Sequence, residues 1–288
     1  MLTDPRPGQA AAGRTCARLR IALVVVALAA LLPNRLHAQA EVPPLAPIET
    51  DRPDFIESSV VVPRHYWQLE NGMLYARTGA LSVVRGTESL LRVGLTDRLE
   101  WRLGLPNVEW ERGPGALGAG HGDAYAGIKW QVGPVGDWEF AVIPGLSLPV
   151  GASGRTSGAW DPELKLTFAR DLPGGFDLAG MVAGALPTEA GVRTSTLQPA
   201  LAVGRELLPG VRLFVEWVGA YQRDRESGHL AHTGIAWRAT NHLQLDVHAG
   251  RRVAGDFPDA FVAFGLSFRR GPEPVRSGPA AAPLPATR

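Results

Sequence analysis

The amino-acid sequence predicts an all-β protein: a transmembrane antiparallel β-barrel of about 12 strands, preceded by an export signal. Three observations lead to this fold class. The N-terminus has the composition of a secretory signal peptide. Polar and apolar residues alternate with period two through much of the remaining chain, which is typical of strands with two different faces. Short turns alternate with longer loops, as in bacterial outer-membrane barrels.

The first 40 residues have the three parts of a secretory signal peptide. Residues 1–20 hold four arginines and one acid, residues 21–32 form an unbroken apolar run, and Ala38-Gln39-Ala40 is a small-x-small cleavage site. A membrane anchor is the alternative, but 12 helical residues span only about 18 Å of a bilayer core about 30 Å thick. We therefore expect cleavage near Ala40.

The composition expected after cleavage excludes several classes of function. The signal removes five of 29 basic residues and one of 28 acids, which leaves 24 and 27 and a net charge of −3. A negative net charge does not indicate the basic surface that nucleic-acid binding requires. Cys16, the only cysteine, leaves with the signal, so no disulfide, thiol nucleophile or thiolate ligand is expected. No later stretch approaches 18 apolar residues, so no transmembrane helix is expected.

Alternating residues predict strands from Tyr66 onward. In residues 98–105 polar and apolar side chains alternate, so Glu100 and Arg102 share one face and Trp101 and Leu103 the other. No comparable stretch of helical periodicity competes with this pattern in the mature chain. The alternation recurs in residues 123–132, 163–168 and 242–249.

The connections between these strands are of two kinds. Short turns are expected at 96–97, 133–136, 171–174, 207–210 and 240–241. Longer, Gly-rich connections are expected at 107–121, 151–159, 188–195, 223–228 and 251–258, with a smaller one near 79–86. Five short turns and six longer connections join about twelve strands. An even number places both ends of the barrel on the short-turn, periplasmic side.

A soluble β-sandwich or lipocalin-like barrel is the structural alternative. With its charged face outside, a soluble barrel of about twelve strands would enclose an apolar lumen too wide for side chains to fill. Apolar residues against lipid and charged residues in a wet lumen remove this difficulty. Four tryptophans near strand ends agree with interfacial girdles: Trp67, Trp138, Trp160 and Trp237.

The organisation expected from these features has four parts: a signal peptide at 1–40, an N-terminal periplasmic or lumenal segment at 41–65, an outer-membrane barrel at 66–269, and a disordered Pro/Ala-rich tail at 270–288. Pro144 and Pro199 fall inside predicted strands. A closed barrel has no free edge, so these prolines are expected at bulges or near a rim.

The segment IETDRPDF at residues 48–55 and the residues after it carry a resemblance to a known family. The match continues through Glu57-Ser58-Ser59, Val62-Pro63, Gln68-Leu69-Glu70, residues 91–97 with Glu100, and residues 148–151. Over most of 48–269 the chain resembles the transporter family labelled "MetA-pathway of phenol degradation". The resemblance implies an outer-membrane barrel, linked by the family's name to aromatic degradation.

Charged residues on the face assigned to the lumen are the candidate binding and selectivity residues: Glu70, Glu100, Arg102, Lys129, Glu163, Lys165, Arg212, Glu216 and Asp246. Their mixed signs argue against strong selectivity for anions or cations. The alternative is that they pair across strands and solvate a closed interior.

The charged motif before the first strand comprises Glu49, Asp51, Arg52, Asp54 and Glu57. In one interpretation residues 48–60 fold into the lumen, narrow the pore and pair with Arg102, Lys129, Lys165 or Arg212. In the other they form a solvated periplasmic lead-in, as polar terminal segments commonly do. The sequence leaves both interpretations open.

The histidines do not predict a metal or catalytic site. His229 and His232 are three residues apart and would lie on opposite faces of a strand. His242 and His248 share a face, but six residues of strand separate them by about 20 Å. No His pairs with a Ser in a recognisable pattern. We expect no cofactor and no metal.

The function predicted from the sequence is a channel or transporter for small molecules, which include hydrophobic or aromatic compounds. A lipid-modifying enzyme and a non-transporting structural barrel are the alternatives. The expected partners are outer-membrane lipid, the barrel-assembly machinery of a Gram-negative cell and a small-molecule solute.

Overall fold

The computed structural model describes residues 46–223 and 225–272. The predicted signal peptide, its cleavage near Ala40 and most of the predicted C-terminal tail lie outside the described residues. Within them the protein is all-β, as predicted. No helix in this part of the chain is long and apolar enough to cross a membrane.

The described residues form sixteen strands. In chain order they are β1 (Trp67–Thr78), β2 (Leu81–Gly94), β3 (Leu99–Gly104), β4 (Val108–Arg112), β5 (Ala119–His121), β6 (Ala124–Val135), β7 (Trp138–Leu148), β8 (Asp161–Leu172), β9 (Phe176–Ala185), β10 (Thr188–Glu189), β11 (Val192–Arg193), β12 (Thr196–Leu208), β13 (Val211–Gln222), β14 (Gly228–Thr240), β15 (Leu243–Ala254) and β16 (Ala260–Arg270).

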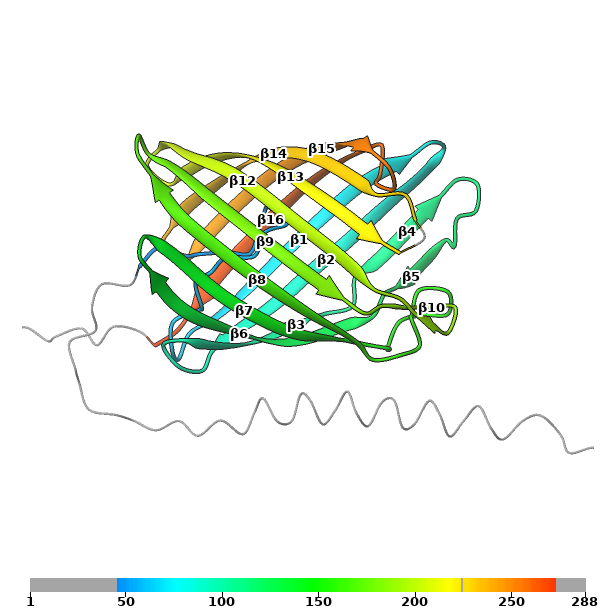
Figure 1. Ribbon diagram of the computed structural model, residues 1–288, viewed down its shortest axis with the longest axis horizontal. Helices are drawn as coiled ribbons and strands as arrows, with labels where there is room; N and C mark the ends of the chain where they lie inside the picture. The colour runs from blue at the N-terminus through cyan, green and yellow to red at the C-terminus, as the bar shows by residue number, and fades with distance from the viewer. Residues whose placement is uncertain (1–45, 224, 273–288) are drawn as a thin grey trace, which may run out of the picture. The chain divides into compact units, whose positions relative to one another are not determined.

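Fourteen of these strands form one antiparallel sheet that closes on itself, because β1 pairs with both β2 and β16. β3 and β4 both pair with β2 and are separated only by residues 105–107. β5 and β6 are likewise separated only by residues 122–123. Each of these two pairs is one interrupted barrel strand, so the wall has the twelve strands predicted (Figure 1). β10 and β11 form a separate two-stranded hairpin.

The two ends of the barrel differ in the length of their connections. Trp67 at the start of β1 pairs with Arg270 at the end of β16, so both ends of the barrel chain lie at the same end. The turns at this short-turn end include the two residues 136–137 and the two residues 209–210. At the opposite end, the loop end, the connections reach the length of residues 149–160. Their positions follow the prediction.

The connection predicted near 79–86 exists but is shorter than predicted. β1 and β2 turn within two residues, Gly79 and Ala80, and the ladder continues directly from Thr78 and Leu81. Gly79 adopts a φ of 56°, a left-handed conformation that glycine reaches without steric cost. The run that follows contains Val83 and Val84, which are β-branched and favour a strand over a loop.

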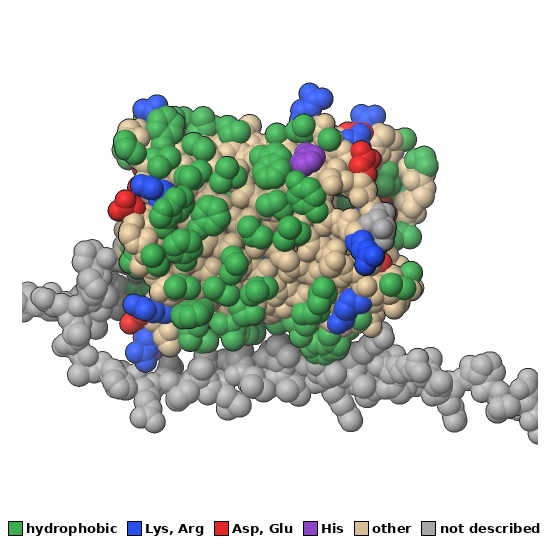
Figure 2. Space-filling view, in the orientation of Figure 1, with side chains coloured by type: hydrophobic (Ala, Val, Ile, Leu, Met, Phe, Trp, Pro, Cys, Tyr) green, Lys and Arg blue, Asp and Glu red, His purple; other side chains and the backbone are tan. Residues whose placement is uncertain are grey.

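The wall has an apolar outer face and a polar inner face, the reverse of a soluble barrel. Outward side chains such as Trp130, Val247 and Phe264 are 49%, 50% and 58% exposed. Figure 2 shows, on one side of the barrel, a broad apolar surface with charged side chains gathered near both ends of the strands. Inward side chains include Gln68 and Lys129, both fully buried. Apolar surface of this extent belongs against lipid.

Pro144 and Pro199 lie within strands, and each is opposite a break in one ladder. Pro144 pairs with Leu164 on β8, but the pairing of β6 with β7 skips it. Pro199 pairs with Val182 on β9, and the pairing of β12 with β13 skips it in the same way. The missing N–H of each proline therefore coincides with a local interruption of the sheet.

The assignment of faces predicts opposite responses to charge along β9. Val182 is 39% exposed on the outer wall, whereas Ala179 faces the lumen and lines a cavity there. Val182→Arg is expected to impair assembly by about 2–4 kcal/mol near the bilayer midplane, and Ala179→Arg to assemble normally. Heat-modifiable migration of the membrane fraction on gels measures the folded barrel. Equal tolerance of both substitutions would show that the faces are misassigned.

Candidate functional site

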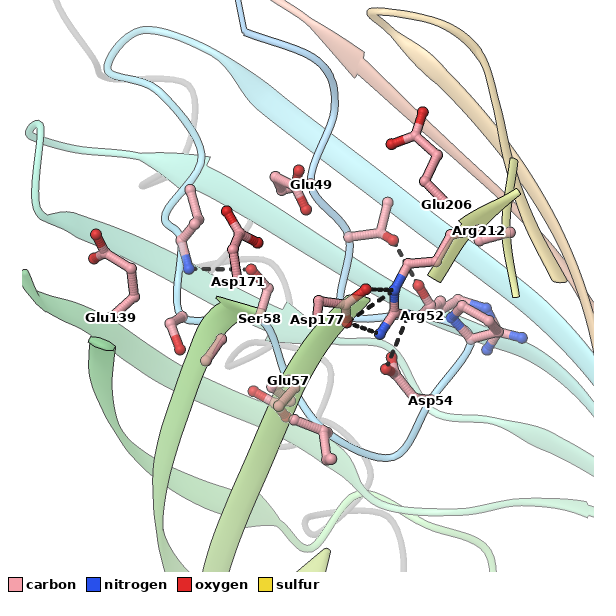
Figure 3. A pocket seen from close by; sticks show the side chains of 18 of the residues that line it. Glu49, Arg52, Asp54, Glu57, Ser58, Glu139, Asp171, Asp177, Glu206 and Arg212 are labelled. Atoms are coloured by element: carbon pink, nitrogen blue, oxygen red, sulfur yellow. Dashed lines mark hydrogen bonds and ion pairs between the residues drawn. The ribbon is translucent and has the colours of Figure 1, made fainter. Parts of the chain in front are cut away.

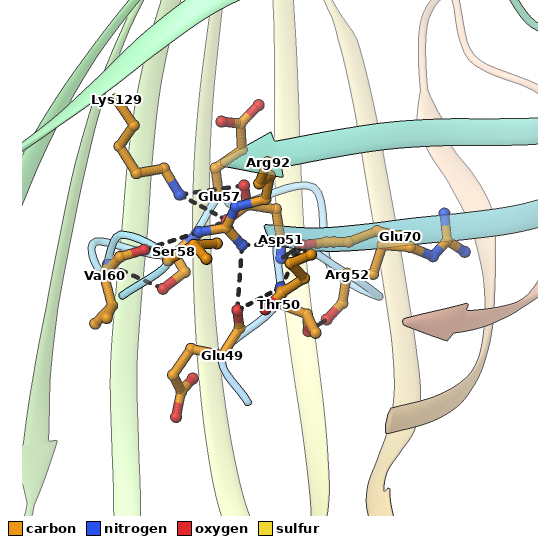
Figure 4. Close-up of polar contacts among 12 residues, drawn as sticks. Glu49, Thr50, Asp51, Arg52, Glu57, Ser58, Val60, Glu70, Arg92 and Lys129 are labelled. Carbon is orange, nitrogen blue, oxygen red and sulfur yellow. Dashed lines mark hydrogen bonds and ion pairs between the residues drawn. The ribbon is translucent and has the colours of Figure 1, made fainter. Parts of the chain in front are cut away.

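Residues 48–62, here called the plug, lie inside the barrel. Ile48 and Val62 at the two ends of the plug are 0% and 2% exposed. The plug contains the charged motif found in the sequence, and its polar groups contact the inner wall on several sides (Figure 4). Of the two interpretations that the sequence leaves open, the structure therefore supports the lumenal one.

Asp51 is the central charged residue of the plug. Its Oδ2 atom accepts a hydrogen bond from Arg102 Nη1 at 2.6 Å, and its Oδ1 atom accepts one from Lys129 Nζ at 2.8 Å. Arg92 Nη1 lies 3.4 Å from the same carboxylate. The carboxylate thus occupies a point where three cations of the wall converge, two of which, Arg92 and Lys129, are labelled in Figure 4.

The environment keeps Asp51 ionised. Burial alone would raise the pKa of the Asp51 carboxyl group, but the positive charges of Arg92, Lys129 and Arg102 outweigh burial and hold this pKa far below its ordinary value. The charge that binds the plug to the wall is therefore present at every pH at which a cell lives.

The cations that bind Asp51 are themselves paired with carboxylates on neighbouring strands. Arg92 Nε lies 2.8 Å from Glu100, and Arg92 Nη1 lies 2.9 Å from Glu70. Strand register explains this arrangement, because Arg92 on β2 is directly opposite Arg102 on β3, and Glu100 is directly opposite Lys129 on β6. Buried charges are tolerated where each has partners of opposite sign, as here.

The wall also binds the backbone of the plug. The backbone N–H of Val62 donates to Glu100 Oε2 at 2.7 Å, and that of Asp51 donates to Glu70 Oε2 at 3.0 Å. Arg92 Nη2 donates to the carbonyl oxygen of Val60 at 2.9 Å. Contacts of this kind fix the path of the plug as well as the positions of its side chains.

Arg52 packs against two glycines where the barrel closes. Gly72 on β1 pairs with Gly265 on β16. A Cβ atom at Gly72 would stand 2.4 Å from the Arg52 guanidinium, and one at Gly265 would stand 2.5 Å from Arg52 Nε. Arg52 also lies 3.0 Å from Glu88 and 3.5 Å from Asp246. The paired glycines leave the space that the guanidinium occupies.

Glu57 continues the ion pairs on the other side of the lumen. It lies 2.8 Å from Arg102 Nη2 and 2.7 Å from Lys165 Nζ. Lys165 in turn lies 2.9 Å from Glu163. Together with the contacts of Asp51, these pairs attach the plug to β3, β6 and β8.

The stretch around Asp54 and Phe55 is held by fewer contacts. Asp54 lies 3.6 Å from Arg212, whose guanidinium is already paired with Asp177 at 2.5 Å (Figure 3). The backbone N–H of Phe55 donates to Glu216 at 3.0 Å. The Phe55 ring meets the His232 ring edge-on at 5.1 Å between centroids.

The pKa of Asp54 moves in the opposite direction to that of Asp51. Burial raises it first, and the negative charge of Glu216 raises it further, against the attraction of Arg212, to about 7. Asp54 therefore exchanges its proton near neutral pH, and the plug is most stable in the lumen when Asp54 is protonated.

Two cavities lie on either side of the plug. One of about 570 Å³ is lined by residues such as Asp171 and Gly175 near the short-turn end (Figure 3). The other, about 460 Å³, is lined by residues such as Asn107 and Asp123 towards the loop end. Arg52 and Glu57 line both cavities. At these two side chains the plug separates the two cavities.

The structure places all nine predicted selectivity residues on the inner face. Six of them, Glu70, Glu100, Arg102, Lys129, Glu216 and Asp246, are at most 6% exposed. All except Glu163 bind a residue of the plug, and Glu163 binds Lys165. Their role in selectivity is a prediction.

The sequence pattern did not identify several residues of the site. Arg92 is fully buried in the site. The sequence pattern misses it because an irregularity in the β1–β2 pairing near Thr87 shifts the alternation of inward and outward residues that precedes Arg92. His232 and His248 lie in neighbouring strands, with ring centroids 5.6 Å apart, although they are sixteen residues apart in sequence. Only the register between strands brings such residues together.

Comparison with solved structures finds outer-membrane barrels. The COG4313 outer membrane channel from Pseudomonas putida F1 matches with a TM-score of 0.61 at 14% identity, covering 74% of this chain and 98% of that chain. The NanC porin and the KdgM porin in complex with disordered oligogalacturonate both match with a TM-score of 0.49, at 8% and 9% identity over 69% and 70% of this chain and 98% of theirs. At these identities the first match shows the fold alone.

No curated protein matches the chain in a sequence comparison. A family model does match, over residues 50–269, and its description is "Putative MetA-pathway of phenol degradation". The match spans the plug from Thr50 and nearly all of the barrel, and it agrees with the resemblance found in the sequence. The chain belongs to this family.

Proposed function

We propose that the protein is a channel of the outer membrane that conducts small solutes and is closed by its own N-terminal plug. The observation that carries this proposal is the pair of cavities separated by the plug. The COG4313 protein, whose solved structure has a similar fold, is itself an outer membrane channel, and this likeness supports the same function. Periplasmic termini and cleavage after Ala40 are part of the proposal.

Within the described residues, non-covalent contacts hold the plug in the lumen. Such contacts break and form again without any change in covalent structure. No strand includes residues 48–62, so the barrel does not need the plug to complete its sheet. Removing the plug would join the two cavities, of about 570 and 460 Å³, into one polar passage. Spaces of this size admit solutes of the dimensions of a sugar or a substituted benzene, a size class typical of ligand pockets.

Aromatic solutes are the first compounds to test, because the family description names phenol degradation. The second cavity contains aromatic surface suited to them, because Tyr125 lines it. Aromatic rings bind one another in offset or edge-on geometry, so this side chain is a candidate contact along the passage.

An enzymatic function is the weaker alternative. His229, on the outer wall, contacts the rings of Trp217 and Tyr221. Within the described residues, His232 contacts Glu216 and aromatic rings inside the lumen. Neither arrangement places a hydroxyl nucleophile beside a histidine base, which acyl transfer to water requires. The proposal therefore does not include an enzymatic activity.

Deletion of residues 41–60 tests the proposal directly. The barrel should assemble, because no strand is lost, and its conductance in a planar bilayer should rise well above that of the whole chain. Uptake of small aromatic solutes into proteoliposomes should rise with it. An assembled deletion variant with unchanged conductance would contradict the role of the plug, and one that never conducts would contradict the channel.

Asp51→Asn is expected to weaken the plug through a single charge. The substitution leaves Arg102 and Lys129 short of one buried partner, which costs about 3–5 kcal/mol. Channel openings in a planar bilayer should become more frequent by more than 100-fold. Asp137→Asn is the matched control, because Asp137 is 82% exposed in its pair with Arg170, away from the plug, and such a pair contributes about 0–1 kcal/mol. Equal opening of both variants would contradict the central role assigned to Asp51.

The raised pKa of Asp54 predicts that the channel opens more as pH rises. A released Asp54 has an ordinary pKa, so the stability that its proton gives the plugged state is complete in acid and is lost as pH rises towards about 7. One proton changes the open population by at most about tenfold per pH unit. Single-channel recordings between pH 5 and 8 measure this effect, and Asp54→Asn should reduce it. An unchanged pH dependence in that variant would assign the effect to other groups.

A further inference from the structure

A row of arginines crosses the outer wall of the barrel at its loop end. The strand register aligns five residues side by side: Arg112 on β4, Ser82 on β2, Arg77 on β1, Ala260 on β16 and Arg251 on β15. Residues directly opposite one another in neighbouring strands point to the same face of a sheet. The three arginines are exposed, as an outward direction requires.

The row has the form of a repeated cationic site. Successive arginines are two strands apart, or about 10 Å. The residues between them, Ser82 and Ala260, are small and leave the space above the wall open. The Nε atom of Arg77 donates to the carbonyl of Gly79 at 3.0 Å, which holds this side chain at the rim. Within the described part of the chain, neither Arg112 nor Arg251 forms an ion pair.

The next row towards the middle of the barrel contains aromatic residues. It includes Trp110 on β4, Val84 on β2, Tyr75 on β1 and Val262 on β16. Trp110 and Tyr75 are both 46% exposed on the outer face. Amphipathic rings mark the depth where hydrocarbon gives way to headgroups. The arginines lie one step beyond these rings, at the level of the lipid headgroups.

We propose that this row binds the phosphate groups of the phosphorylated glycolipid in the outer leaflet. A guanidinium offers two parallel N–H donors to a phosphate, which suits arginine to this ligand better than lysine. A lipid with two phosphates held apart by sugar rings engages two arginines of the row at once. Its acyl chains then lie against Trp110 and Tyr75. The inference rests on the proposed location of the barrel in the outer membrane, with its loop end facing outward.

The test measures lipid binding by the full chain in detergent, with native mass spectrometry and a bisphosphorylated glucosamine disaccharide lipid as the probe. The variant Arg77→Gln/Arg112→Gln/Arg251→Gln removes the row. The variant Arg64→Gln/Arg98→Gln/Arg270→Gln removes three exposed arginines near the short-turn end and serves as the charge-matched control. The single variant Arg251→Gln replaces the triple variant if the latter does not assemble.

The row variant should lose at least tenfold in affinity, and the control should stay within about twofold of the parent chain. The parent chain should bind the dephosphorylated lipid, and phosphatidylglycerol micelles, at least tenfold more weakly than the probe. Higher salt should weaken binding of the probe, because exposed charges are screened. Equal binding by the row variant, or equal binding of the dephosphorylated lipid, would overturn the proposal. Conductance of the same variants after plug deletion should be unchanged, which separates this outcome from a failure of the channel function.

Discussion

The carboxylate of Asp51 is the interaction on which the interior of the barrel depends. The wall around it carries three cations, Arg92, Arg102 and Lys129, but only two buried carboxylates, Glu70 and Glu100. A group of buried charges with a net positive sign is costly, because desolvation of each ion is repaid only by close partners of opposite sign. Asp51 supplies the missing negative charge, so the wall is electrically complete only when the plug is in place.

The strength of attachment is uneven along the plug. On the side of β2, β3 and β6, side-chain and backbone contacts of Asp51 and Val62 are short and fully buried. On the side of β13 and β14, Asp54 shares Arg212 with Asp177, and Phe55 contributes one backbone hydrogen bond and ring contacts. The weaker half is also the half whose protonation changes near neutral pH. Opening that begins at Asp54 and Phe55 leaves the anchor at Asp51 intact, which allows the plug to return.

Much of the fold and part of the site follow from the sequence. Alternation over residues 98–105 and 123–132 identifies Glu100, Arg102 and Lys129 as lumenal, because each inward position in a regular strand is two residues from the next. Arg92 escapes this reasoning, because the irregularity near Thr87 shifts the alternation. The position of the plug also cannot be read from the chain, because a charged segment is stable in water and in a charged lumen alike. The register between strands, which decides between the solvated and the lumenal position, is a property of the folded sheet.

The site of Arg52 has a consequence for how the molecule is built. Gly72 and Gly265, which flank its guanidinium, belong to the first and last strands of the barrel, and these strands meet only when the cylinder closes. Before the cylinder closes, Gly72 and Gly265 are not yet side by side, so only one of them can border the space for Arg52. The site that receives Arg52 is therefore complete only after β16 has paired with β1. Barrel closure finishes this part of the plug's binding site, so the plug reaches its full set of contacts only in a completed barrel.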